Sequence, residues 1–141
     1  MNFKIDEKTI TIEEFNEFEV LLEGLKLPDD YKSHMLTYNG GYPDGDYVCF
    51  RNPNRIIELE YFHPIKYGSD TMEYYLFMRK VLPKNHISIG IISGGRISLS
   101  LSELDYGSVY ISYEDVIPEK IASSFTEFIN GLFEADPDSY F

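Results

Sequence analysis

The stretch that decides the fold covers residues 27–46 and reads LPDDYKSHMLTYNGGYPDGD. It predicts a short helix beginning at Pro28, because the proline ring fixes a helical φ and its missing N–H is not needed in the first turn. Tyr31 and Tyr38 stand two helical turns apart, so we expect them to share a buried face. Asn39 and the two glycines after it tolerate a left-handed backbone, and the helix is predicted to end there.

Another helix is predicted just before this stretch. Thr11 and Glu14 have the spacing of a capping box, in which each side chain accepts a hydrogen bond from the other residue's backbone N–H. Apolar side chains follow at spacings of three and four residues, as on one face of an amphipathic helix. They are Ile12, Phe15, Phe18, Leu22 and Leu25. The chain is therefore expected to open with a helical hairpin.

After residue 46 the periodicity changes to that of β-strands. Short runs rich in β-branched and aromatic residues alternate with Asn, Pro and Gly turn signals. Strands are predicted at residues 47–51, 57–61, 87–91, 97–101 and 108–113. In the second to fourth of these strands, every second side chain is apolar and is expected to face the core. Ser93-Gly94-Gly95 is predicted to form a tight hairpin turn, because glycine readily takes positive φ.

Two further helices are predicted around these strands. The first is capped by Asp70 and ends before Pro83, and the second begins at Pro118. Their apolar positions at helical spacing are Met72, Tyr75, Met78 and Leu82 in the first, and Ile121, Phe125, Phe128 and Leu132 in the second. The predicted fold class is therefore α+β: a largely antiparallel β-sheet flanked by an N-terminal helical hairpin, a middle helix and a C-terminal helix.

The charge balance restricts the class of partner. Asp and Glu number 24 against 12 Lys and Arg, which gives a formal net charge of −12. Such a surface repels phosphate groups, so direct binding of nucleic acid or of an anionic membrane is not expected. It attracts a basic partner and speeds the encounter, although acidity can also serve solubility alone. The single cysteine and the lack of a signal-like or membrane-spanning run predict a cytoplasmic protein.

The sequence offers no candidate catalytic, metal-binding or cofactor-binding site. The three histidines are scattered, with no second ligand at metal-binding spacing. They are His34, His63 and His86. Cys49 lies in an apolar run, where a small buried side chain is expected. Glu58 and Glu60 could serve acid–base chemistry, but a solvated sheet face explains them more simply. We therefore predict a protein without enzymatic activity, metal or cofactor.

Five motifs taken together resemble a known family. In chain order they are Leu27-Pro28-x-x-Tyr31, Tyr38-Asn39-Gly40-Gly41-x-Pro43, Gly94-Gly95-x-Ile97, Asp105-x-Gly107-x-Val109-Tyr110 and Ser124-Phe125-x-x-Phe128. Their order and spacing are similar to those of the SUKH superfamily, specifically its Smi/Knr-type branch. The resemblance extends over about residues 12–133 and implies that residues 1–141 form a single domain of this type.

The resemblance implies an α+β fold with a largely antiparallel sheet and no catalytic activity. Bacterial members are mostly immunity proteins, which bind polymorphic toxins encoded beside them, and those toxins are often nucleases. Nucleases hold nucleic acid on basic surfaces, for which an acidic inhibitor can compete. The expected function is therefore neutralisation of a basic, nuclease-type toxin by direct protein–protein contact. The alternative is a regulatory or scaffold adaptor of the same fold without a toxin partner, as the fungal relatives suggest.

Exposed acids and one tyrosine are the expected contacts with such a partner. They are Tyr42, Asp44 and Asp46 in the loop after the two glycines, Glu58 and Glu60 on a strand, and Glu114 and Asp115 after the last predicted strand. For each of them the alternative is an ordinary solvated residue, and Tyr42 could instead pack beneath its loop.

Overall fold

Consecutive antiparallel hairpins form the centre of the molecule. The computed structural model describes residues 1–53, 55–136 and 138. Its strands are β1 (Phe3–Lys4), β2 (Tyr42–Pro43), β3 (Val48–Asn52), β4 (Arg55–Phe62), β5 (His86–Ile92), β6 (Gly95–Ser100), β7 (Val109–Ser112), β8 (Glu119–Ala122) and β9 (Leu132–Glu134). Seven of them form one antiparallel sheet in the order β8-β7-β6-β5-β4-β3-β9, and β1 pairs separately with β2.

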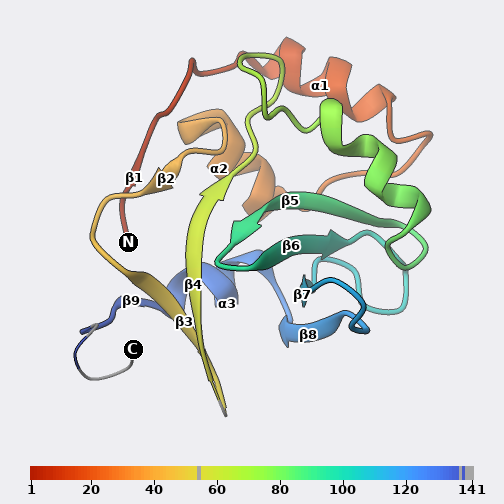
Figure 1. The fold of residues 1–141 in the computed structure, drawn as a ribbon. Helices are drawn as coiled ribbons and strands as arrows, with labels where there is room; N and C mark the ends of the chain where they lie inside the picture. The colour runs from red at the N-terminus through yellow and green to blue at the C-terminus, as the bar shows by residue number, and fades with distance from the viewer. Residues whose placement is uncertain (54, 137, 139–141) are drawn as a thin grey trace.

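This sheet is strongly curled. Figure 1 shows it bending from β4 round to β7 and β8. Arg55 at the start of β4 forms an ion pair with Glu119 of β8, although three strands lie between β4 and β8 in sheet order. The curl therefore brings the start of β4 and the edge strand β8 close enough for direct side-chain contact.

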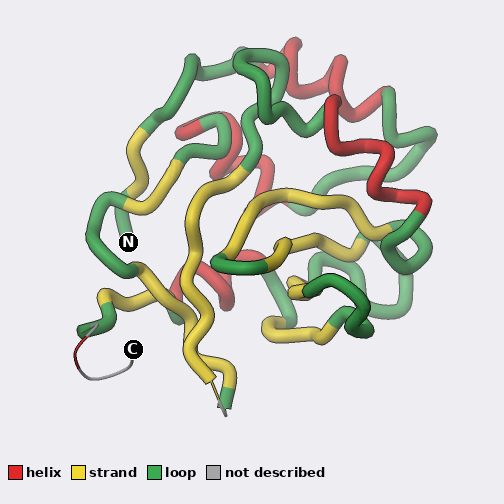
Figure 2. Tube along the Cα trace, viewed as in Figure 1, coloured by secondary structure: helices red, strands yellow, loops and turns green. Residues whose placement is uncertain are grey.

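Helical segments lie around the central strands on more than one side, as Figure 2 shows in red. They are α1 (Ile12–Val20), α2 (Asp29–Tyr38), the 3-10 helix η1 (Tyr74–Lys80) and α3 (Phe125–Asn130). None of the helices in the described residues is long and apolar enough to cross a membrane. The predicted α+β class with a largely antiparallel sheet is confirmed.

One face of the sheet is apolar and carries the hydrophobic core. Ile97 and Leu99 of β6 lie opposite Ile111 and Val109 of β7, and all four are at most 1% exposed. The α-helices cover this face with buried aromatic side chains. These are Phe15 and Phe18 of α1, Tyr31 of α2, and Phe125 and Phe128 of α3. The buried faces predicted for the first two helices are confirmed at these positions.

The two N-terminal helices begin close to the predicted residues. Thr11 caps α1, because its Oγ1 accepts from the N–H of Glu14 at 3.1 Å and Glu14 Oε1 accepts from the N–H of Thr11 at 3.0 Å. α2 begins at Asp29, with Pro28 as an extended N-cap rather than as the first helical residue. Asn39 ends α2 in the left-handed region, with a φ of +47°.

Asn39 also ties the end of α2 to two distant segments. Its side-chain amide donates to the carbonyl oxygens of Lys8, at 2.8 Å, and Ile65, at 2.9 Å. Its Oδ1 accepts from the N–H of Ile65 at 2.7 Å. Gly40 follows with a φ of +87°, and a Cβ there would lie 2.7 Å from carbonyl oxygens at the end of β4. Only glycine allows the chain to pass β4 so closely.

Two irregularities change which side chains face the core. The pairing of β4 with β5 shifts between Leu59 and Tyr61, so Phe62 is buried in place of Tyr61. The pairing of β5 with β6 shifts next to Gly90, and Ile91 is left partly exposed. A β-bulge adds one residue to one strand and thereby reverses the alternation beyond it. The predicted alternation is therefore wrong at Tyr61 and Ile91.

The predicted middle helix is wrong in type and in its cap. The segment is a 3-10 helix, η1, in which no side chain is buried. Asp70 does not cap it, because its carboxylate accepts from the hydroxyl groups of Tyr61, at 2.6 Å, and Tyr75, at 3.3 Å. The buried apolar residues are Met72 and Leu82, which lie on either side of η1.

The predicted C-terminal helix is wrong over its first part and at its end. Residues Glu119–Ala122 form β8, and α3 begins only after Ser124, whose Oγ accepts from the N–H of Glu127 at 2.9 Å. Leu132 belongs to β9, which pairs with β3. Pro118 can precede a strand as readily as a helix, and backbone pairing with β7 decides in favour of the strand.

We expect Asn39→Gly to lower the free energy of unfolding by about 2–4 kcal/mol, because two buried backbone groups of Ile65 and the part-buried carbonyl of Lys8 lose their partner. Glycine keeps the left-handed backbone, so this variant isolates the side-chain hydrogen bonds. Asn39→Ala should cost about 1 kcal/mol more, since alanine is strained at positive φ. Urea unfolding of both variants measures the two contributions. An Asn39→Gly variant as stable as the parent would contradict the role given to the side chain.

Candidate functional site

The second face of the sheet is polar and is partly covered by η1. Arg96 and Ser98 of β6 alternate with the core residues of that strand and therefore point to this face. The ring of Tyr75 in η1 stacks on His63, with centroids 4.2 Å apart, and the Arg96 guanidinium lies 5.0 Å from the Tyr75 centroid. Arg96 Nη1 also donates to Ser88 Oγ at 3.1 Å. Stacked aromatic and cationic groups thus hold η1 against the sheet.

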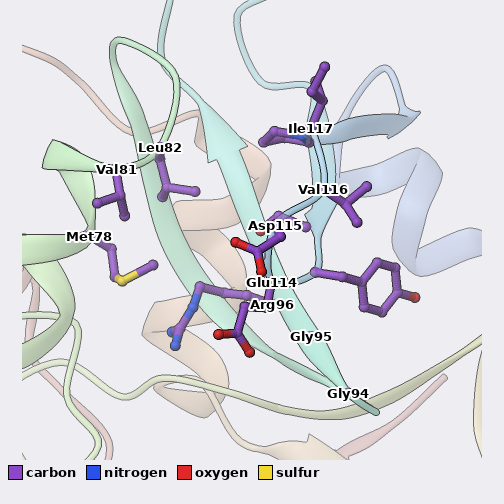
Figure 3. Close-up of a pocket in the computed structure, with 13 residues that line it drawn as sticks. Met78, Val81, Leu82, Gly94, Gly95, Arg96, Glu114, Asp115, Val116 and Ile117 are labelled. Carbon is purple, nitrogen blue, oxygen red and sulfur yellow. The ribbon is translucent and has the colours of Figure 1, made fainter.

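A groove opens where η1 ends. It lies between the C-terminal part of η1 and the segment that connects β7 to β8, and its volume is about 850 Å³. Met78, Val81 and Leu82 form one wall and Val116 and Ile117 the other, with Arg96, Glu114 and Asp115 between them (Figure 3). Segments far apart in the sequence therefore build one concave surface.

Two tight backbone arrangements shape this groove. A Cβ on Gly95 would lie 2.5 Å from the carbonyl oxygen of Ser112, so β6 and β7 can approach this closely only because residue 95 is glycine. Asp115 has a φ of +61°, a conformation that aspartate tolerates better than most residues. The N–H of Val116 then donates to the carbonyl oxygen of Tyr113 at 3.2 Å, which closes a turn. This turn leaves the next apolar residues on the surface.

The walls of the groove are highly exposed for aliphatic side chains. Val81 is 72% exposed, Val116 59% and Ile117 87%. Tyr74 and Phe77 of η1 are also more than half exposed, although they do not line the groove. Single exposed apolar residues are common on proteins, but several of them around one groove are typical of a binding surface.

Charged groups of opposite sign flank the groove. Glu114 and Asp115 are exposed, and neither forms an ion pair with any of the described residues. Arg79 and Lys80 stand in the last turn of η1, at the other wall. Arg96 lies between the two walls and is engaged by the Ser88 hydroxyl and the Tyr75 ring. The two carboxylates therefore remain available to an incoming cation.

Two of the seven predicted contact residues line this groove, and two more lie on β4, outside its lining. Glu114 and Asp115 line it directly. Glu58 is partly buried opposite Cys49, and its carbonyl oxygen accepts from Ser93 in the β5–β6 turn, whose glycines line the groove. Glu60 is exposed two residues further along β4.

The other three predicted contact residues lie elsewhere. Tyr42 is in β2 and is 39% exposed, so it does not pack beneath its loop. Asp44 and Asp46 are exposed in the segment leading to β3, near the opposite edge of the sheet order from β7 and β8. Asp44 forms an ion pair with Lys4 at 3.6 Å. The structure does not bring these three residues to the groove.

Sequence reasoning missed the apolar walls. Met78 and Leu82 were expected on the buried face of a regular helix, and Val116 and Ile117 were assigned to no element. The available signal was the pair Val116-Ile117 directly before Pro118 and outside any periodic run. An apolar pair in that position has no predicted core to join, which is an indication of a surface role.

Catalytic chemistry finds little support in the described residues. Ser88 Oγ lies 3.4 Å from His63 Nε2, but both residues are almost completely buried, and burial and then the charge of Arg96 lower the pKa of His63 to about 4. Burial and then the charge of Glu58 raise the pKa of the Cys49 thiol to about 11, which disfavours the nucleophilic thiolate. The described residues contain no group of three or more His, Cys, Asp or Glu that could hold a metal ion.

Stability should fall as the pH is lowered from about 6.5 to about 4. Burial is the main cause that lowers the pKa of both His34 and His63 to about 4. The unfolded chain therefore takes up these protons first, and each histidine removes on the order of 3 kcal/mol by the time the pH is below about 4. Glu14 adds to the loss of stability only below about pH 4.5, because a hydrogen bond with Lys66 is the main cause that lowers its pKa to about 2 in the folded protein.

Urea midpoints measured between pH 7 and pH 4 test this expectation. His34 Nε2 lies 2.8 Å from the carbonyl oxygen of Gly40, and the amide of a His34→Gln variant can keep a donor there. This variant should lose part of the pH dependence. A urea midpoint that does not change over this range would contradict the prediction.

Most residues of the family motifs support the fold, and of them only Gly94 and Gly95 line the groove. Leu27, Tyr31 and Phe128 are at most 4% exposed, and Asn39 makes the buried hydrogen bonds described above. A comparison with curated proteins found no match. The family model described as the SMI1 / KNR4 family (SUKH-1) matches residues 9–131, close to the range over which the motifs resemble it. The chain therefore belongs to the SMI1/KNR4 family, SUKH-1.

Proposed function

We propose that this protein is an immunity protein that neutralises a cognate toxin by binding it directly, without chemistry. The observation that carries the proposal is the family match over residues 9–131, because bacterial proteins of this family are mostly immunity proteins. The site agrees with a binding role, since the groove has exposed apolar walls. The one serine–histidine contact found in the described part of the chain, Ser88–His63, is buried away from solvent.

A nuclease-type toxin suits the charge of this chain. A formal net charge of −12 attracts the basic surface with which a nuclease holds its nucleic acid. Exposed acids occur near both edges of the sheet order, at Asp44 and Asp46 before β3 and at Glu114 and Asp115 after β7. We propose that these acids, with Tyr42, Glu58 and Glu60, meet the toxin, so that bound inhibitor occupies the surface its substrate needs. Such a protein would act in the cytoplasm, where a nuclease toxin meets nucleic acid.

Co-expression with the product of the neighbouring gene tests the proposed function. We expect the two proteins to co-purify and the growth arrest caused by the partner alone to disappear. Binding without any arrest to rescue would favour the adaptor alternative. A toxic neighbour that neither co-purifies with this protein nor loses its toxicity would refute the immunity function.

Association with the toxin should depend on salt. If the acidic surface steers the encounter, the association rate constant should fall about tenfold or more between about 50 mM and 500 mM NaCl, while dissociation changes less. Stopped-flow measurements of the parent, of Asp44→Asn/Asp46→Asn and of Glu114→Gln/Asp115→Asn would show which edge contributes. Glu103→Gln is a matched control at another exposed acid. An association rate that does not respond to salt would contradict electrostatic steering.

A further inference from the structure

We infer that the groove between η1 and the β7–β8 segment is an anchoring site for an apolar side chain of a basic protein partner. The inference rests on the proposed function, which makes the partner a protein. What it adds is the surface that binds the partner and the apolar and basic groups that the partner presents to it. Glu114 and Asp115 of this surface were expected contacts, but its apolar walls were not predicted from the sequence.

The first argument is the shape and polarity of the groove. Its volume of about 850 Å³ exceeds that of any single side chain, so an anchor and part of the adjoining backbone can enter. Both walls are aliphatic, and Val81 and Ile117 expose 72% and 87% of their surface in the free protein. Covering these side chains removes apolar area from water, which is the main favourable term in most protein association.

The second argument is the position of the charges. Glu114 and Asp115 line the groove directly before Val116, and within the described part of the chain neither has an ion-pair partner. A Lys or Arg next to the apolar anchor would meet these two carboxylates. Arg96 is already held by Ser88 and Tyr75. Arg79 and Lys80 stand on η1 at the opposite wall and form no ion pair with the two carboxylates.

The third argument concerns the identity of the occupant. A second copy of this chain would bring another net charge of −12 to the same surface, and the repulsion between the copies opposes self-association. A nucleic acid or an anionic lipid meets the same repulsion. A basic protein is attracted by the whole molecule and finds local carboxylates beside an apolar groove.

The helix that supplies Met78 to the groove also exposes two aromatic residues. Tyr74 and Phe77 are 62% and 53% exposed, and their ring centroids lie 6.0 Å apart in an edge-to-face arrangement. Aromatic side chains are enriched among the residues that dominate binding energy at protein interfaces. We therefore expect the partner to contact η1 as well as the groove.

Selection from a library of random displayed peptides tests the inference without any toxin. The immobilised parent protein, Ile117→Asp and Leu104→Asp serve as the three targets. Ile117 is in the groove wall, and Leu104 is a matched control that is 97% exposed at the other end of the β6–β7 pair. We expect peptides with an apolar residue next to Lys or Arg, binding Ile117→Asp at least about tenfold more weakly and Leu104→Asp within about twofold.

A second variant separates the acidic contribution from the apolar one. Glu114→Gln/Asp115→Asn should weaken the same peptides about fivefold at low salt and little at high salt. Asparagine tolerates the left-handed backbone of residue 115, so this variant should fold, and thermal unfolding checks all variants. No enrichment, enrichment that ignores Ile117, or peptides with acidic flanks would each overturn the inference. None of these results bears on toxin rescue, so failure of the groove and failure of the proposed function are distinguishable.

Discussion

The buried amide of Asn39 is the interaction on which the rest of the structure depends. Its three hydrogen bonds join the end of α2, the N-terminal segment at Lys8 and the chain after β4 at Ile65. Because the amide is only 1% exposed, displacing α2 would leave buried polar groups without partners. The position of α2 in turn decides where Tyr31 meets Phe125, with ring centroids 5.2 Å apart in the core. A single polar side chain thus fixes the packing of an apolar core.

Local signals in the sequence predicted the structure where the interaction itself is local. The Thr11–Glu14 capping box and the left-handed Asn39 depend on residues a few positions apart, and both are confirmed. The failures depend on contacts distant in sequence. The bulge that buries Phe62 arises from pairing with β5, and β8 exists because an adjacent strand was available to it. Helical spacing alone carries no information about such neighbours.

The candidate site was predictable to a smaller extent. Acidic composition pointed to a basic partner, and Glu114 and Asp115 do line the groove. The walls come from η1 and from the β7–β8 segment, which no sequence pattern places side by side. A periodicity argument assigns apolar residues to the core, so it could not assign Val81 or Ile117 to the surface. Stacking of Tyr75 on His63, which holds η1 on the polar face, likewise joins residues from different elements.

The 3-10 helix η1 has a consequence for how this protein can evolve. None of its side chains is fully buried, and its attachment relies on Tyr75, Arg96, the partly buried Leu76 and the flanking Met72 and Leu82. Substitutions at its outward positions therefore disturb few core contacts and are tolerated at little cost in stability. Mutational drift can then remodel one wall of the groove while the scaffold stays unchanged. A lineage built in this way can alter the shape and polarity of this surface without rebuilding its core.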